Sequence, residues 1–260
     1  MQFFPFILAC VAGLVVGSFL NVVIYRVPRK IGFVAGSSRC PHCSQPLKWF
    51  HNIPLLSFLA LRGKCANCKE SISLRYPLVE LLNSLFYLYC YWQFGLSLHS
   101  VALGFLASSL LLIFFIDLDF QIIPDSITIP GMIVGLGISF APGGIGIVNA
   151  LIGLVVGGGA LYAIAVLGDW LFKKESMGGG DIKMAAMLGS FMGWQKILLV
   201  FISSAVIGVV VTLGLMLFSA RLRRERLVPF GPFLSVAAVL ALVAGDRIIE
   251  FYISNFLPTP

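Results

Sequence analysis

Long apolar stretches separated by short polar segments run along most of the 260-residue chain. A helix needs about 20 apolar residues to cross a bilayer. The pattern therefore predicts an all-α polytopic membrane protein with about eight transmembrane helices. Two of the predicted spans, residues 127–141 and 183–194, are short and could be half-spans or re-entrant segments. The predicted spans are residues 4–24, 77–95, 98–116, 127–141, 146–168, 183–194, 197–219 and 232–253.

One polar segment, residues 25–76, is long enough to be a small region of its own. The chain thus divides into a first transmembrane helix (1–24), this polar region (25–76) and a multi-helix membrane domain (77–260). No internal repeat is evident. The first apolar stretch could be a cleaved signal peptide, but it lacks a basic n-region and its apolar run is long. We therefore expect a retained first span.

Composition agrees with this reading, since only 11% of the residues are charged against about 25% in soluble domains. The net charge of +7 does not indicate nucleic-acid binding, because the basic residues gather in a few loops. These loops are residues 25–76, 173–183 and 221–226. If the chain crosses the membrane lipid eight times, all three basic loops lie on the same side of the bilayer. The positive-inside rule makes that side cytoplasmic and places the N-terminus in the periplasm.

Four cysteines of the polar region form two pairs, "CPHC" (Cys40, Cys43) and "CANC" (Cys65, Cys68). Paired C-x-x-C units about 20 residues apart are a strong zinc signal. Four thiolates fill a tetrahedral shell, which favours a structural rather than a catalytic ion. Two disulfides are the alternative, but a cytoplasmic location disfavours them.

The few carboxylates of the chain include a set near predicted membrane boundaries. Asp117 and Asp119 close the third span, Asp125 precedes the fourth, and Asp181 precedes the sixth. The charge-derived topology brings Asp117 and Asp181 to the same membrane face. Asp117 lies deeper than Asp119 and is the better partner of Asp181, because residues two apart on a helix point in different directions. Asp125 resembles a helix cap. Glu80 could be functional or a helix-dipole partner.

Two facing carboxylates would share one proton, so that one can activate water while the other protonates a scissile carbonyl. Gly178, Gly179 and Gly180 before Asp181 could adopt strained backbone and let an extended peptide approach. Alternatively, they form a turn with Asp181 as an N-cap. An ion-coupled transporter also uses intramembrane carboxylates, and a non-catalytic scaffold with a zinc knuckle is a further alternative.

Four segments, in this order, resemble the bacterial type IV prepilin peptidases, a family of GxGD aspartyl proteases. They are "GSFLNVVIYRVP", the cysteine-bearing region from "CPHC" to "RYPLVE", "IDLDFQIIPDSIT" and "MGGGDIKM". The resemblance implies that Asp117 and Asp181 are the catalytic pair. It implies prepilin or type II secretion pseudopilin substrates, cleaved after a glycine, and a location in the bacterial inner membrane with the active site on the cytoplasmic side.

The same resemblance implies a second activity, because many members also methylate the new N-terminus with S-adenosylmethionine. The cysteine-bearing region is associated with that half of the activity. No glycine-rich nucleotide loop of the Rossmann type occurs in residues 25–76. The sequence therefore assigns no residue to binding of the methyl donor.

Overall fold

The structure is a computed structural model that describes residues 3–32, 38–174, 177–218 and 228–256. The chain forms two compact units, Met1–Leu112 and Ile113–Pro260, which meet within one helix. The predicted basic loop at residues 221–226 lies outside the described residues. In the described part all regular elements are helical, apart from two isolated β-bridges. The predicted all-α class is therefore confirmed.

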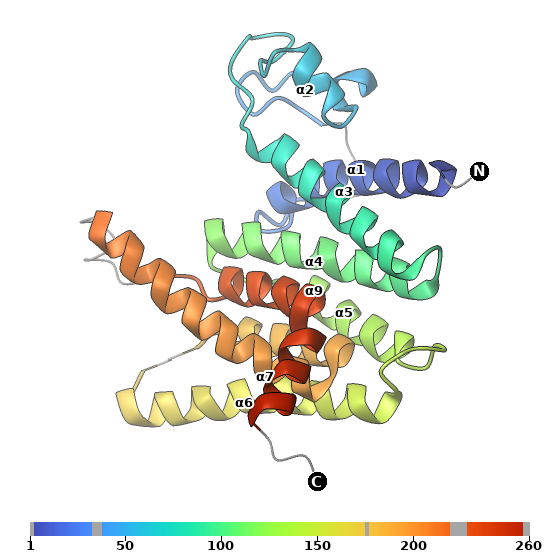
Figure 1. Cartoon of the computed structure of the whole chain (residues 1–260). Helices are drawn as coiled ribbons and strands as arrows, with labels where there is room; N and C mark the ends of the chain where they lie inside the picture. The colour runs from blue at the N-terminus through green and yellow to red at the C-terminus, as the bar shows by residue number, and fades with distance from the viewer. Residues whose placement is uncertain (1–2, 33–37, 175–176, 219–227, 257–260) are drawn as a thin grey trace. The chain divides into compact units, whose positions relative to one another are not determined.

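The first unit contains α1, the short helices η1 and α2, α3 and most of α4 (Figure 1). Their bounds are α1 Phe3–Arg26, η1 Trp49–Asn52, α2 Leu56–Ala60, α3 Arg75–Phe94 and α4 Leu98–Phe120. Helix α3 ends at Gly95, whose φ of 61° is readily adopted by glycine. Ser97 and Ser100 then cap the start of α4 reciprocally, each backbone N–H donating to the other side chain.

Helices α1 and α3 pack closely through small residues of α1. A Cβ on Gly13 would lie 2.6 Å from the Cα of Ser84, and one on Gly17 would lie 2.7 Å from the Cα of Glu80. Asn83 is fully buried at this contact and donates to the carbonyl of Gly13 at 2.8 Å. The glycines of the first span thus allow close helix packing, as expected of membrane helices.

In its described residues, the second unit contains the end of α4 and four further helices. These are α5 Asp125–Ile138, α6 Ile147–Phe172, α7 Gly179–Phe218 and α9 Gly231–Phe256. Helix α6 packs along α7. The contact depends on glycine on both sides, since a Cβ on Gly189 would overlap the carbonyl of Gly153. Helix α7 breaks at Gly193, which has φ 76°.

Among the described residues, five helices are long and apolar enough to cross a membrane: α1, α4, α6, α7 and α9. Helix α3 occupies the predicted second span without meeting that criterion, and α5 is a short apolar helix. Helix α7 breaks at Gly193, and its two parts correspond to the predicted sixth and seventh spans. The predicted count of eight transmembrane helices is thus not confirmed.

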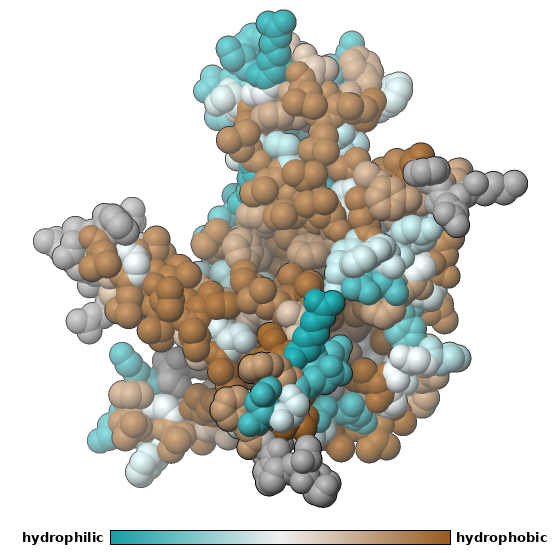
Figure 2. Space-filling model, in the orientation of Figure 1, coloured by the Kyte–Doolittle hydropathy of each residue, from teal (hydrophilic) through white to brown (hydrophobic). Residues whose placement is uncertain are grey.

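The helices expose large hydrophobic side chains in both units. Examples are Val15 at 56%, Ile202 at 65% and Phe251 at 65% exposed. Figure 2 shows extensive hydrophobic surface over the helices, with hydrophilic patches over the segment that contains α2 and also near the C-terminal end of the chain. Such a surface is expected where lipid replaces water around a helical bundle.

Candidate active site and cysteine cluster

Asp117 lies in the last turn of α4 and is only 6% exposed. Its Oδ2 accepts a hydrogen bond of 2.9 Å from the backbone N–H of Gly231, the first residue of α9. A helix N-terminus offers unpaired N–H groups and a positive dipole end, which suit a carboxylate. The sequence analysis missed Gly231. The pair Gly231-Pro232 just before an apolar stretch is a helix-start signal that could have found it.

Asp181 lies in the first turn of α7, and its backbone N–H donates to the carbonyl of Gly178 at 3.1 Å. Its side chain is partly buried, and Oδ1 is shielded from solvent without a hydrogen-bond partner among the described residues. A buried carboxylate oxygen without a partner costs free energy. This oxygen is therefore free to bind water or a substrate group.

The second unit brings Asp117 and Asp181 together, as the predicted topology requires. The two carboxyl groups are close enough that Asp117 acts electrostatically on Asp181. Ile123, in the loop after α4, connects the two sides: a Cβ on Gly180 would lie 2.8 Å from its Cβ, and one on Gly231 would lie 3.2 Å from its Cδ1. The segment that carries Asp181 and the start of α9, whose N–H holds Asp117, therefore both pack on one apolar side chain.

The three glycines before Asp181 do not have the strained backbone that the sequence predicted. None of Gly178, Gly179 and Gly180 has a positive φ, and the last two already belong to α7. Gly180 is required for close packing on Ile123, whereas nothing lies within 4 Å of a Cβ on Gly179. Asp181 is also not an N-cap, because it is the third residue of the helix.

The other two acids of this region occupy different environments. Asp119 is exposed, in line with the expectation that it is solvated. Asp125 is not the cap of α5, because Pro124 takes that position. Asp125 instead forms a two-oxygen contact with Lys183 of α7, with distances of 2.7 and 2.8 Å. This ion pair joins the starts of α5 and α7 beside Asp181.

The cysteine cluster lies in the first unit. The Sγ atoms of Cys40, Cys43, Cys65 and Cys68 all lie within 4.8 Å of one another, and those of Cys40 and Cys68 are 3.9 Å apart. Zinc–sulfur bonds of about 2.3 Å in a tetrahedron separate the sulfur atoms by about 3.8 Å. The four thiols remain unbonded to one another. The donor set and spacing thus fit a metal ion, and the alternative of two disulfides is not observed.

Two hairpins with the same hydrogen-bond pattern build this cluster, 25 positions apart. Cys40 N–H donates to the carbonyl of Gln45 and Cys65 N–H to that of Glu70. Isolated bridges Arg39–Pro46 and Lys64–Ser71 close the two hairpins. The sequence analysis expected no internal repeat, and this local repeat was missed because the two segments share little beyond their cysteines.

The thiols of the second hairpin differ in acidity. Hydrogen bonds from the backbone N–H groups of Cys68 and Asn67 lower the pKa of Cys65 to about 6. The backbone N–H of Glu70 acts to lower the pKa of Cys68, but burial and the neighbouring thiols raise it to about 11. Cysteines ligate a metal ion as thiolates, so metal binding by this cluster depends on pH.

Comparison with known proteins relates both regions to one family. Residues 11–94 match the bacterial peptidase A24 N-terminal domain, and residues 104–213 match the type IV leader peptidase family. A prepilin leader peptidase/N-methyltransferase of Stutzerimonas stutzeri is 41% identical, over 94% of this chain and 92% of the relative. One of Pseudomonas putida is 38% identical, over 95% and 92%.

The chain belongs to the type IV leader peptidase family.

The family resemblance predicted from the four sequence segments is thereby confirmed. The N-terminal family match contains the cysteine cluster, and the leader peptidase match contains both Asp117 and Asp181. These matches favour the peptidase over the transporter that the sequence left as an alternative. No solved structure matches the chain. The catalytic role of the two aspartates remains a prediction.

Proposed function

We propose that this protein removes the leader peptide from type IV prepilins or type II secretion pseudopilins, cutting after a glycine. The same protein then methylates the new N-terminal amine. The proposal is supported by membership of the type IV leader peptidase family and by relatives named prepilin leader peptidase/N-methyltransferase. The single observation that carries the peptidase half is the pair of neighbouring carboxyl groups, Asp117 and Asp181, at the ends of two helices.

Asp117 and Asp181 are the catalytic pair in this proposal. Like charges a few Å apart cannot both ionise, so the pair holds one proton and titrates as a unit. The ionised carboxylate takes a proton from water, which attacks the scissile carbonyl, and the protonated partner donates to that carbonyl oxygen. The Gly231 N–H fixes the orientation of Asp117, and no donor among the described residues hydrogen-bonds Oδ1 of Asp181.

The substrate fits a site at a membrane boundary. A prepilin leader is short and basic, and an apolar helix follows the cleavage site. We place the active site on the cytoplasmic side of the bacterial inner membrane, with the N-terminus in the periplasm. The positive-inside rule supports this orientation. Gly178 and Gly179 lie beside Asp181 and carry no side chain that would obstruct an extended peptide, whereas Gly180 packs on Ile123.

Residues 25–76 form the cytoplasmic methyltransferase-associated region in this proposal, and residues 77–260 the membrane protease domain. Zinc is the metal that four clustered thiolates fit best, and it would hold the two hairpins together. S-adenosylmethionine supplies the methyl group when it is bound. A region of this size is marginal as an independent fold, so the metal would supply much of its stability.

Coexpression with a prepilin tests the proposal, with mass spectrometry of the pilin reporting leader removal and the added methyl group together. We expect both changes with the wild-type protein. Asp117→Asn and Asp181→Asn should abolish cleavage, whereas the exposed neighbour Asp119→Asn should retain it as a matched control. Metal analysis of the purified protein should find one zinc per chain. An uncleaved pilin with the wild-type protein would refute the peptidase half.

A further inference from the structure

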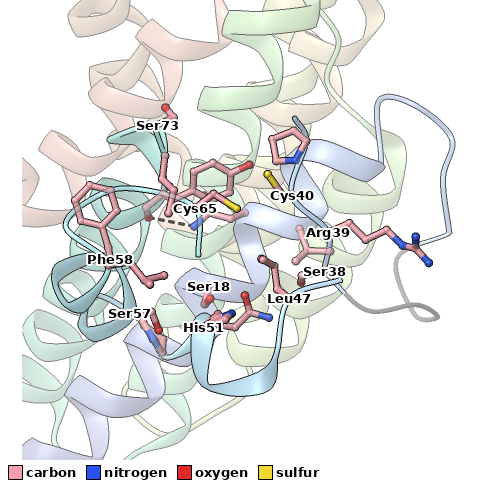
Figure 3. A pocket seen from close by; sticks show the side chains of 18 of the residues that line it. Ser18, Ser38, Arg39, Cys40, Leu47, His51, Ser57, Phe58, Cys65 and Ser73 are labelled. Atoms are coloured by element: carbon pink, nitrogen blue, oxygen red, sulfur yellow. Dashed lines mark hydrogen bonds between the residues drawn. The ribbon is translucent and has the colours of Figure 1, made fainter. Parts of the chain in front are cut away.

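A large pocket in the first unit contains neither of the two aspartates. Its volume is about 1350 Å³, and it is enclosed by α1, the segment of η1 and α2, the two cysteine hairpins and the start of α3. Figure 3 shows Ser18 and His51 on one side of this pocket, with Cys40 and Cys65 on another. Pockets for small ligands are typically about 300–1,000 Å³. This pocket therefore has room for a cofactor-sized ligand together with part of a second molecule.

A buried carboxylate lines this pocket. Glu80 is 8% exposed, and its Oε2 accepts a hydrogen bond of 2.9 Å from the backbone N–H of Leu55. Ser18 also hydrogen-bonds the carboxylate. Burial of a charge is costly unless it is paired or used, and the peptidase chemistry makes no use of Glu80.

The partner of Glu80 has an unusual backbone. Leu55 has φ 58° and ψ −46°, a conformation that L-residues rarely adopt. In this conformation its N–H donates to Glu80 at 2.9 Å. Backbone strain of this kind is concentrated at functional sites. The strained turn and the buried acid together indicate that the position of the carboxylate matters.

The rest of the lining combines aromatic and polar groups. Trp49, Phe58 and Tyr76 are aromatic residues of this lining. The Nδ1 atom of His51 is buried, and nothing in the described chain hydrogen-bonds it. Cys40 and Cys65 belong both to the lining of the pocket and to the cysteine cluster. A ligand that matches this lining has a flat ring, hydroxyl or ammonium donors for Glu80, and an acceptor or donor for His51.

We propose that this pocket binds the methyl donor, S-adenosylmethionine, and that Glu80 accepts hydrogen bonds from its hydroxyl or ammonium groups. This inference rests on the proposed methyltransferase function. The adenine ring suits the aromatic lining, and the sulfonium cation is attracted to ring faces and to the carboxylate. The same pocket leaves space for the N-terminal amine of the cleaved pilin.

Methyl transfer from S-adenosylmethionine to the pilin amine needs no further reactant. The lone pair of the pilin amine forms the new N–C bond to the methyl carbon. The C–S bond breaks, and its electron pair stays on sulfur, so the sulfonium becomes a neutral thioether. The amine loses one proton to water. The role of the protein in this step is to bind and orient the two molecules.

Binding of tritiated S-adenosylmethionine to the purified full-length protein tests the proposal. Glu80→Gln keeps the side-chain size and can still accept the Leu55 N–H. We expect it to weaken donor binding by about tenfold or more and to lower methylation, while leader cleavage and metal content stay near wild type. Ser18→Phe should block the pocket and abolish binding. Glu250→Gln, on an exposed turn of α9, is the matched control and should bind normally.

Photochemical cross-linking of the tritiated donor to the wild-type protein shows which residues lie beside the bound donor. This measurement does not depend on the folding of any variant. We expect the label on peptides within residues 15–80. Wild-type affinity in both pocket variants, or label confined to residues 113–260, would overturn the pocket assignment while the methyltransferase function stands. A wild-type protein that neither binds the donor nor methylates a cleaved pilin would refute that function itself.

Discussion

The contact between Gly231 and Asp117 provides a sharp test of the active-site geometry. A Cβ at position 231 would lie 2.6 Å from Oδ2 of Asp117, the oxygen that accepts the Gly231 N–H. A carbon–oxygen contact is normally about 3.3 Å or longer. Gly231→Ala therefore has to move the carboxylate or the start of α9 by roughly 0.7 Å.

A shift of this size weakens the hydrogen bond and turns Asp117 away from Asp181. A hydrogen bond to a charged group contributes about 1.5–3 kcal/mol, and a misplacement of about 1 Å at a catalytic group can cost about 100-fold in rate. We expect Gly231→Ala to lower the rate of leader cleavage by about 10- to 100-fold. Methylation of a pilin that is already cleaved should be unaffected, because Gly231 lies outside the first unit.

The assay is the initial rate of cleavage of a purified prepilin by the protein in detergent, at saturating substrate. Gly137→Ala is the matched control, because it is an exposed helical glycine and a Cβ there meets nothing within 4 Å. Metal content and thermal stability of both variants should match wild type. If Gly231→Ala cleaves as fast as Gly137→Ala, Asp117 does not depend on this contact and the proposed orientation is wrong.

Three further predictions concern other contacts. Cys40→Ser should lose the bound metal and methylation but retain leader cleavage, as measured by metal analysis and mass spectrometry; a full metal complement would contradict the cluster. Gly189→Val should give little folded protein by size-exclusion chromatography, because its side chain overlaps the Gly153 carbonyl. Lys183→Met should change the unfolding free energy by less than about 1 kcal/mol, because Lys183 and Asp125 are both exposed; a larger loss in denaturant titration would refute this.

The helical class, the cysteine cluster and the convergence of two acids could be predicted from local signals. Apolar length predicts helices, C-x-x-C spacing predicts shared ligation, and loop charge sets the side of each helix end. Each signal lies within a few residues of the feature it predicts. Asp117 and Asp181 are 64 positions apart, and the second unit brings them together as the sequence predicted.

Other features depend on contacts that no local pattern encodes. The break between the two parts of α7 is at Gly193, whose φ of 76° no apolar pattern encodes, a few residues before the predicted boundary between the two spans. The need for Gly180 comes from Ile123, a residue on another segment. In the same way, Gly231 acquires its role only because α9 begins against the end of α4.

The repeated hairpins show the limit of sequence comparison within one chain. Their cysteines coincide at an offset of 25 positions, but the equivalent residues Gln45 and Glu70 contribute only backbone carbonyls. A hydrogen bond to a carbonyl places little demand on the side chain that bears it. The repeat is therefore visible in the backbone pattern and not in the residue types.

The central claim is that Asp117 and Asp181 act as one unit around a shared proton. The most direct measurement is the cleavage rate of Asp117→Asn, Asp181→Asn and the double variant on one prepilin. Residues that act together have non-additive effects, so the double variant should be no slower than either single variant. Single variants with substantial activity, or losses that multiply in the double variant, would contradict the claim.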